Sequence, residues 1–170
     1  MLITAVAVAV AAIATVLGLA AVTHQRAHPQ PVVIPTVPAP QANSAECQRL
    51  MSALPERLGD LARTPPADPA PAGAAAWRGG NGEPVVLRCG LARPADFVVG
   101  SPIQIVDAVQ WFQVADQGPA GPGRATWFTV DRPVYVALTL PNGGGPTPIQ
   151  QLSDVIAKTL AAMPIQPGPP

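Results

Sequence analysis

The side chains that could act as nucleophiles lack a base near them in the sequence. The two histidines, His24 and His28, directly follow an N-terminal hydrophobic run. Acyl transfer by a serine needs a histidine or an equivalent base within hydrogen-bond reach. A Ser–Lys dyad would depend on Lys158, which we expect on the exposed side of the last helix. We therefore predict no catalytic residue among the serines, which are Ser44, Ser52, Ser101 and Ser153.

Paired carboxylates are the second chemistry that the residue types allow. Two acidic groups on either side of a glycosidic bond, one with a raised pKa, hydrolyse glycans. Most of the acidic residues fall in predicted turns, where aspartate is common for conformational reasons. A cell-wall glycan hydrolase is therefore kept as the alternative function, with its pair drawn from Glu83, Asp96, Asp107, Asp116 and Asp131.

Anion binding and cofactor binding have weaker signals. The triple glycine at positions 143–145 lacks the Lys-Ser/Thr that would hold a phosphate. Arg88 and Arg132 lie in or beside predicted strands and could bind an anionic ligand, although arginines there also protect strand edges. Ten basic residues balance ten acidic ones, so no field favours nucleic acid. No cofactor and no nucleic-acid partner are expected.

The two cysteines, Cys47 and Cys89, are 42 residues apart. An even cysteine count beyond an export-like segment favours one disulfide in an oxidising compartment. Metal binding would need further ligands, and a redox pair would normally have the spacing Cys-x-x-Cys. Two buried reduced thiols in a cytosolic domain are the remaining alternative. We predict a structural disulfide and no metal site.

The first of the elements that position these residues is a hydrophobic run at the start of the chain. Residues 2–22 form an uncharged stretch of 21 residues, and a helix of that length covers ~30 Å, about one bilayer core. A cleavable secretory signal would have a shorter apolar run and a basic start. We predict a transmembrane anchor over residues 1–22.

The orientation of this anchor rests on two conflicting signals. Arg26 follows the run, and the positive-inside rule would place that side in the cytoplasm. The predicted disulfide favours the opposite side. We give the cysteines more weight and expect a single-pass protein of the cell membrane with its domain on the extracytoplasmic side.

After the anchor, composition predicts a linker, one domain and a tail. The prolines of residues 23–43 indicate a semi-rigid spacer. Ser44 is a good N-cap for a helix through Cys47 and Leu50, with Leu58 and Leu61 in a further turn after Pro55. Residues 64–82, rich in proline and glycine, predict a surface excursion. Residues 164–170 predict a disordered tail.

Four segments of the domain predict strands or hairpins: residues 84–90, 103–114, 125–131 and 133–140. The second is either one long strand or a hairpin turning at Asp107-Ala108, which we slightly prefer. A final helix begins at Thr147 and carries an apolar stripe. The predicted fold of residues 44–163 is therefore α+β, a two-layer sandwich of a mainly antiparallel sheet of about four strands with an N-terminal and a C-terminal helix.

Trp77 lies within the predicted excursion and Trp111 within the predicted hairpin. Trp77 is expected to pack on the core. An exposed tryptophan is alternatively a contact residue, so the two indoles form the candidate contact surface.

The stretch from Trp77 through Gly-Glu-Pro-Val-Val-Leu-Arg-Cys-Gly-Leu to Pro94 resembles a family of small, proline-rich, membrane-anchored or secreted actinobacterial proteins, a domain of unknown function. Cys47 with Leu54-Pro55 and the later Val109-Gln110-Trp111 are similar to further parts of its pattern. The insertion of residues 78–82 departs from it. The resemblance spans roughly residues 44–160 and implies an envelope location and a disulfide, but no activity.

Together these features predict a non-catalytic extracytoplasmic envelope domain with a binding or structural role. The partner would be another envelope protein or a cell-wall polymer.

Overall fold

The computed structural model describes residues 30–80, 82–115 and 124–170. Residues Pro31–Pro170 form one compact unit, distinct from Met1–Gln30. The predicted anchor, both histidines and Asp116 lie outside the described residues. Within the part of the chain that is described, no helix is long and apolar enough to cross a bilayer.

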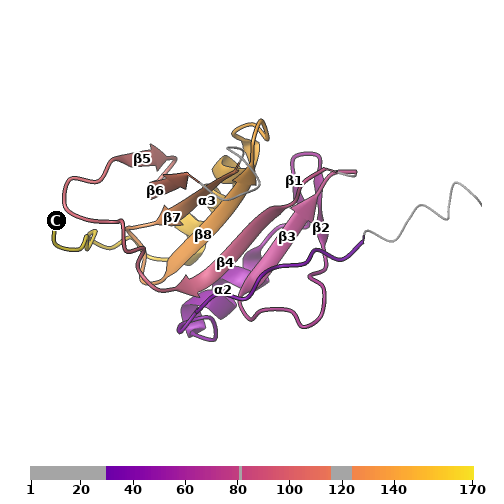
Figure 1. The fold of residues 1–170 in the computed structure, drawn as a ribbon, viewed down its shortest axis with the longest axis horizontal. Coiled ribbons are helices and arrows are strands. Elements are labelled where there is room, and N and C mark those ends of the chain that lie inside the picture. The colour runs from indigo at the N-terminus through magenta and orange to yellow at the C-terminus, as the bar shows by residue number, and fades with distance from the viewer. Residues whose placement is uncertain (1–29, 81, 116–123) are drawn as a thin grey trace, which may run out of the picture. The chain divides into compact units, whose positions relative to one another are not determined.

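The domain is built on one antiparallel sheet of eight strands (Figure 1). The strand order is β1-β2-β3-β4-β8-β7-β6-β5, so two four-stranded meanders meet where β4 pairs with β8. The strands are β1 (Arg57–Leu58), β2 (Leu61–Thr64), β3 (Ala74–Arg78), β4 (Val85–Leu91), β5 (Ile103–Val106), β6 (Val109–Ala115), β7 (Arg124–Thr129) and β8 (Tyr135–Pro141).

The expected sandwich with about four strands is therefore wrong, and the additional strands lie mainly before residue 80. Leu58 and Leu61 belong to the hairpin of β1 and β2, because Gly59 turns the chain with a φ of 57° and the helix does not continue past Pro55. The expected excursion at residues 64–82 contains β3, which pairs with both β2 and β4. The preferred hairpin at Asp107-Ala108 is confirmed by the pairing of β5 with β6.

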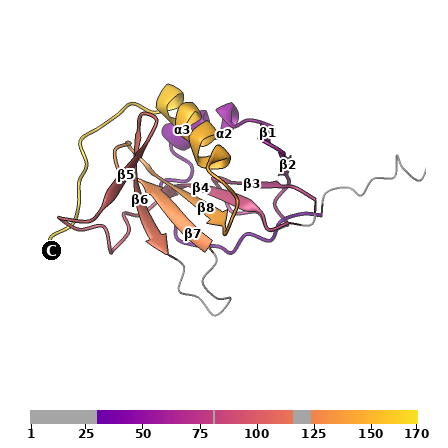
Figure 2. The ribbon, with the colours of Figure 1, turned by 90° about the horizontal axis from the view of Figure 1, so that it is seen from above.

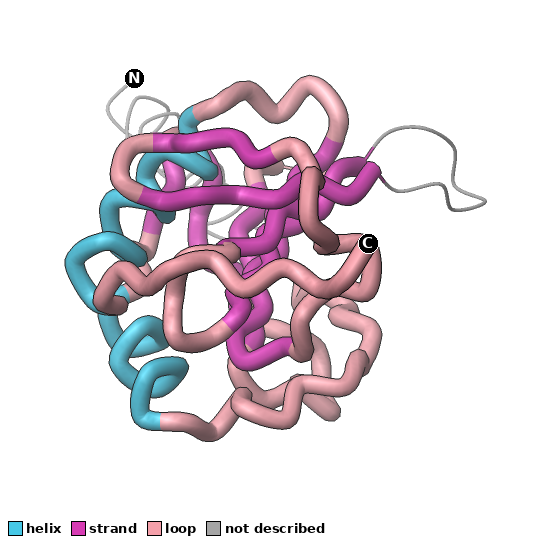
Figure 3. The backbone as a smooth tube through the Cα atoms, turned by 90° about the vertical axis from the view of Figure 1, so that its left-hand side faces the viewer, coloured by secondary structure: helices cyan, strands magenta, loops and turns pink. Residues whose placement is uncertain are grey.

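Two helices, α2 (Ala45–Ala53) and α3 (Thr147–Thr159), cover one face of the sheet (Figures 2 and 3). The predicted N-cap of α2 is confirmed, since the Ser44 side chain accepts a hydrogen bond from the Cys47 N–H. Helix α3 starts one residue earlier than expected: Pro146 is its N-cap and makes no side-chain capping bond.

The main core lies between this face and the helices. In strand β8, Val136 and Leu138 are buried toward the helices, as is Val134 directly before the strand. Leu152 and Ile156 of α3 meet them there, fully buried. Strand β4 contributes Val85, Leu87 and Cys89 to the same core, so its intervening residues point to the opposite, helix-free face.

The helix-free face is covered on one side by residues 31–42, which we call the N-terminal arm. Val32 and Ile34 are buried against Ala74, Ala76 and Val86. Farther along the arm, the Gln41 N–H donates to the Gly90 carbonyl. This part of the predicted linker therefore belongs to the folded domain, because its alternating apolar side chains find an apolar sheet beneath them.

Residues 164–170, the C-terminal arm, cover the other side of the helix-free face. They were expected to be disordered. Instead, Ile165 packs against a cluster that includes Phe97 and Phe112, and Gly168 exchanges backbone hydrogen bonds with Phe97 and Val99. The N-terminal arm thus lies over β3 and β4, whereas the cluster beneath the C-terminal arm includes Phe112 of β6 and Tyr135 of β8.

Candidate functional site

The predicted disulfide is present and buried. Cys47 of α2 and Cys89 of β4 are bonded with a Cα–Cα distance of 5.7 Å, and neither is exposed. The bond fixes α2 to the centre of the sheet. It closes a loop that contains the first three strands.

Trp77 packs in the core, as expected, and Trp111, the other residue of the candidate contact surface, is a core residue too. Both indoles are 0% exposed. The Trp77 Nε1–H donates to the Pro55 carbonyl at 2.9 Å, and the Arg63 guanidinium lies over its ring. These side chains therefore present no surface to a partner.

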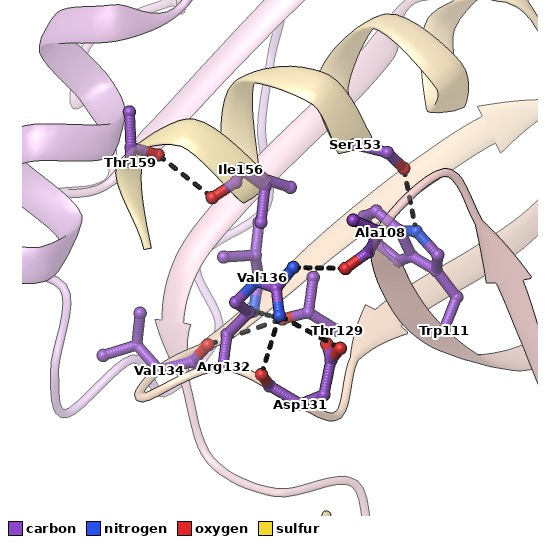
Figure 4. Close-up of polar contacts among 10 residues, drawn as sticks. All are labelled: Ala108, Trp111, Thr129, Asp131, Arg132, Val134, Val136, Ser153, Ile156 and Thr159. Atoms are coloured by element: carbon purple, nitrogen blue, oxygen red, sulfur yellow. Dashed lines mark hydrogen bonds and ion pairs between the residues drawn. The ribbon is translucent and has the colours of Figure 1, made fainter. Parts of the chain in front are cut away.

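Trp111 pairs with a serine from the facing helix (Figure 4). Its Nε1–H donates to the Ser153 Oγ at 3.0 Å in a buried environment. Ser153 is thereby a core hydrogen-bond acceptor.

The other three serines are also engaged in local backbone contacts. Ser44 caps α2, the Ser52 hydroxyl donates to the Arg49 carbonyl, and the Ser101 hydroxyl donates to the Asp96 carbonyl. Lys158 pairs with Asp154 on the exposed side of α3. No serine of the described ranges is hydrogen-bonded to a general base.

The described acidic residues proposed for glycan hydrolysis occupy separate places in the fold. Glu83 forms an ion pair with Arg124 at 3.1 Å. Asp107 occupies the turn between β5 and β6 with a φ of 53°, and Asp96 lies in the loop after β4. Across residues 30–80, 82–115 and 124–170, no three His, Cys, Asp or Glu side chains gather as metal ligands.

Asp131 is buried and forms an ion pair with Arg132 after β7 (Figure 4). The Arg132 Nη1 lies 3.0 Å from the Asp131 Oδ2, and its Nη2 donates to the Ala108 carbonyl at 2.6 Å. Burial raises the pKa of Asp131, against the opposing effects of a backbone hydrogen bond from Gln110 and of the Arg132 charge. The pair joins the β7–β8 turn to the β5–β6 hairpin, so Arg132 is engaged internally.

Arg88 differs from Arg132, because it forms no hydrogen bond or ion pair among the described residues. It lies in β4 on the helix-free face, partly buried, opposite Ala74 of β3 and Ala137 of β8. Its Nε is fully buried without a hydrogen bond. Burial lowers the pKa of its guanidinium, and no carboxylate near it opposes that effect.

A family model described as "Protein of unknown function (DUF3515)" matches residues 6–165. The chain belongs to the DUF3515 family. No curated protein and no solved structure matches it.

The family match agrees with the resemblance to a domain of unknown function and extends beyond the stretch in which that resemblance was recognised. For this DUF3515 domain, sequence reasoning identified Arg88 as one of two possible anion-binding residues. The register of β3, β4 and β8 distinguishes them, because it places alanines on both sides of Arg88 and leaves it unpaired.

Proposed function

We propose that this DUF3515 protein is a membrane-anchored domain of the cell envelope, on the extracytoplasmic side, that binds a partner and does not catalyse a reaction. The observation that carries the proposal is the buried Cys47–Cys89 disulfide. Thiols in most cytosolic proteins are kept reduced, whereas disulfides persist in exported domains. The bond therefore supports an oxidising compartment.

The uncharged stretch at residues 2–22 supports the anchor, since its 21 residues match the thickness of a bilayer core. A tether of this kind would hold the domain close to the outer surface of the membrane. The partners available there are other envelope proteins and cell-wall polymers.

The non-catalytic part of the proposal is supported by how the candidate groups are used. The serine hydroxyls form local or core hydrogen bonds. Glu83 and Asp131 are each paired with an arginine. These contacts give each group a structural role.

Mass spectrometry of the protein isolated from its native membranes tests the proposal. Free thiols are alkylated first, and trypsin is added without reductant. Cleavage after arginine places Cys47 in peptide 27–49 and Cys89 in peptide 89–124, because Pro94 blocks cleavage after Arg93. We expect these two peptides to be linked, and peptide 1–26 to be retained.

Two controls make the result decisive. Reduction before alkylation should separate the linked peptides, and a Cys89→Ala variant should leave Cys47 alkylated. Unlinked, fully alkylated cysteines in the native protein would place the domain in a reducing compartment and overturn the proposal.

A further inference from the structure

The two edges of the eight-stranded sheet differ in how well they are protected. Strand β1, at one edge, has only two residues and carries Arg57, and both features oppose pairing with another strand. Strand β5, at the other edge (Figure 2), is Ile-Gln-Ile-Val, with neither a charge nor a proline. Its Ile105 side chain is 72% exposed. Of the two edges, β5 is therefore the one that is open to a further strand.

The backbone groups that face this open edge belong to Ile103 and Ile105. Gln110 of β6 lies directly opposite Ile105 and bonds in the other direction. Its carbonyl accepts from the Val130 N–H, and its N–H donates to Asp131. Ile105 and Gln110 therefore form a non-hydrogen-bonded pair, and the alternation of antiparallel pairing extends this to Ile103 two residues along. The N–H and C=O groups of both isoleucines point outward, where no described segment pairs with them.

One register lets β5 of a second copy use all of these groups. If Gln104 lies opposite Gln104 of the second copy, Ile103 of each copy lies opposite Ile105 of the other. Each such pair exchanges both of its N–H···O=C hydrogen bonds. The side chains of the pair share the helix-free face, where Ile103 already packs against the cluster of Phe97 and Phe112. The exposed Ile105 thereby extends the apolar cluster of the other copy.

The residues that flank the central pair fit the same register. Pro102 lies opposite Val106 of the second copy in a non-hydrogen-bonded pair, so the N–H that proline lacks is not needed. The next pair joins Ser101 to Asp107, so no two like charges face each other. The register thus avoids the features that would oppose self-pairing.

The same arrangement suits two copies attached to one membrane. Residues directly opposite each other in a sheet point to the same face, so the helix-free faces of the two copies lie on the same side of the joint sheet. Both N-terminal arms cover that face. Because the proposed anchor precedes each arm in the chain, the arrangement is compatible with two anchors in one bilayer.

We propose that the domain binds a second copy of itself through the β5 edges, as one continuous antiparallel sheet with a two-fold axis at Gln104. The interface is isologous, and addition of a strand to an exposed edge supplies its backbone hydrogen bonds. A four-residue strand gives a small interface, so confinement of the copies to a membrane would favour pairing by raising their effective concentration. Only this membrane argument rests on the proposed function, whereas the pairing of the edges does not.

Cross-linking of the full chain in isolated native membranes tests the pairing. Gln104→Cys introduces one free thiol at an exposed position, because the two native cysteines are bonded to each other. Residues of a non-hydrogen-bonded pair have Cα atoms ~4.5 Å apart, within the ~4.4–6.8 Å that a disulfide spans. We expect oxidation with copper phenanthroline to give a species of twice 17.4 kDa on a non-reducing gel.

Three further variants control this result. Ser52→Cys places a thiol at an exposed position of α2 and should stay monomeric under the same oxidation. Ile105→Lys, added to Gln104→Cys, should slow the cross-linking at least about tenfold, because a lysine opposes pairing at a strand edge. Val33→Lys, added in the same way, makes the same change at a site on the N-terminal arm that is 79% exposed. It should leave the cross-linking unchanged.

Several outcomes would overturn the inference: a Gln104→Cys chain that stays monomeric, equal cross-linking of Ser52→Cys, or no effect of Ile105→Lys. A cross-linked species of another mass would assign the edge to a different protein and would also reject self-pairing. Failure of the proposed function is distinguishable, because the Cys47–Cys89 linkage is measured before oxidant is added. Linked native cysteines without cross-linking would reject only the self-pairing, and free native thiols with specific cross-linking would reject only the location.

Discussion

At the scale of single residues, the Trp111–Ser153 hydrogen bond joins the sheet to α3. Both groups are buried, so water cannot replace either partner. We expect Ser153→Ala to lower the free energy of unfolding by ~1–3 kcal/mol, because the indole N–H is left unpaired. Urea denaturation followed by tryptophan fluorescence measures this.

Ser52→Ala is the matched control, since its hydroxyl bonds to the backbone at an exposed position of α2. Its effect should stay within about 0.5 kcal/mol. Equal effects of the two variants would show that the buried bond contributes nothing specific.

The sequence also predicted the roles of single residues better than it predicted the elements. The cysteine pair and the Ser44 cap follow from local chemistry, and the structure has both. The core position of Trp77 was expected, but its hydrogen-bond partner and the neighbours of Arg88 were harder to predict, because they are distant in the chain. The Pro55 carbonyl, 22 positions earlier in the chain, accepts the hydrogen bond of the Trp77 indole. The alanines beside Arg88 come from two other strands.

At the scale of elements, the N-terminal arm lies so close to β4 that only glycine fits beneath it. Gly90 has a φ of 85°, and a Cβ there would lie 2.3 Å from the Ala42 nitrogen. Gly100 has a similar φ of 90° with open space around it. The two positions therefore separate backbone strain from a steric clash.

We expect Gly100→Ala to cost ~1–2 kcal/mol, the penalty for a left-handed alanine. Gly90→Ala should cost clearly more, because the arm must also move away from the sheet. Thermal unfolding and limited proteolysis within residues 31–42 compare the two. Similar stability and similar protection of the arm in both variants would contradict the close packing described here.

The turn between β7 and β8 gives a pH-dependent prediction. Arg132→Met leaves the buried Asp131 carboxylate without its counter-charge, and removal of one partner from a buried pair costs ~3–5 kcal/mol at pH 7. Burial already raises the pKa of Asp131, and loss of the arginine raises it further. The folded state then binds the proton more tightly than the unfolded state, so the cost shrinks as the pH falls.

Urea denaturation at pH 7 and pH 5 checks this expectation. Arg124→Met is the control, because its ion pair with Glu83 is exposed and should contribute less than about 1 kcal/mol. A penalty for Arg132→Met that is the same at both pH values would show that Asp131 does not titrate in this range.

The elements that sequence patterns missed have identifiable causes. Strand β3 begins with three alanines, which have low strand propensity, and it forms because β2, β4 and the N-terminal arm pack around it. The Gly59-Asp60 pair between Leu58 and Leu61 is typical of a hairpin turn, although the apolar spacing of the two leucines favoured a further helical turn. For the two arms, composition indicates an extended chain but not the surface on which it lies.

At the scale of the whole molecule, the disulfide should contribute a large part of the stability. Its 42-residue separation is worth ~4 kcal/mol in the chain-entropy estimate. We expect Cys47→Ala combined with Cys89→Ala to lower the free energy of unfolding by about this amount. Guanidinium denaturation with and without reductant measures it, and the reductant should affect the unmodified protein but not the double variant.

The same covalent bond determines how the domain would carry tension. A force that pulls on Pro31 acts first on the N-terminal arm, which is held to the rest of the domain by the backbone hydrogen bonds of Val32 and Gln41. Once these hydrogen bonds break, only residues 31–46 can extend, which is about 50 Å of chain. The extension stops there because the disulfide transmits the force from Cys47 directly to Cys89. The load then enters β4, between β3 and β8, while the chain between the two cysteines is bypassed and stays unloaded.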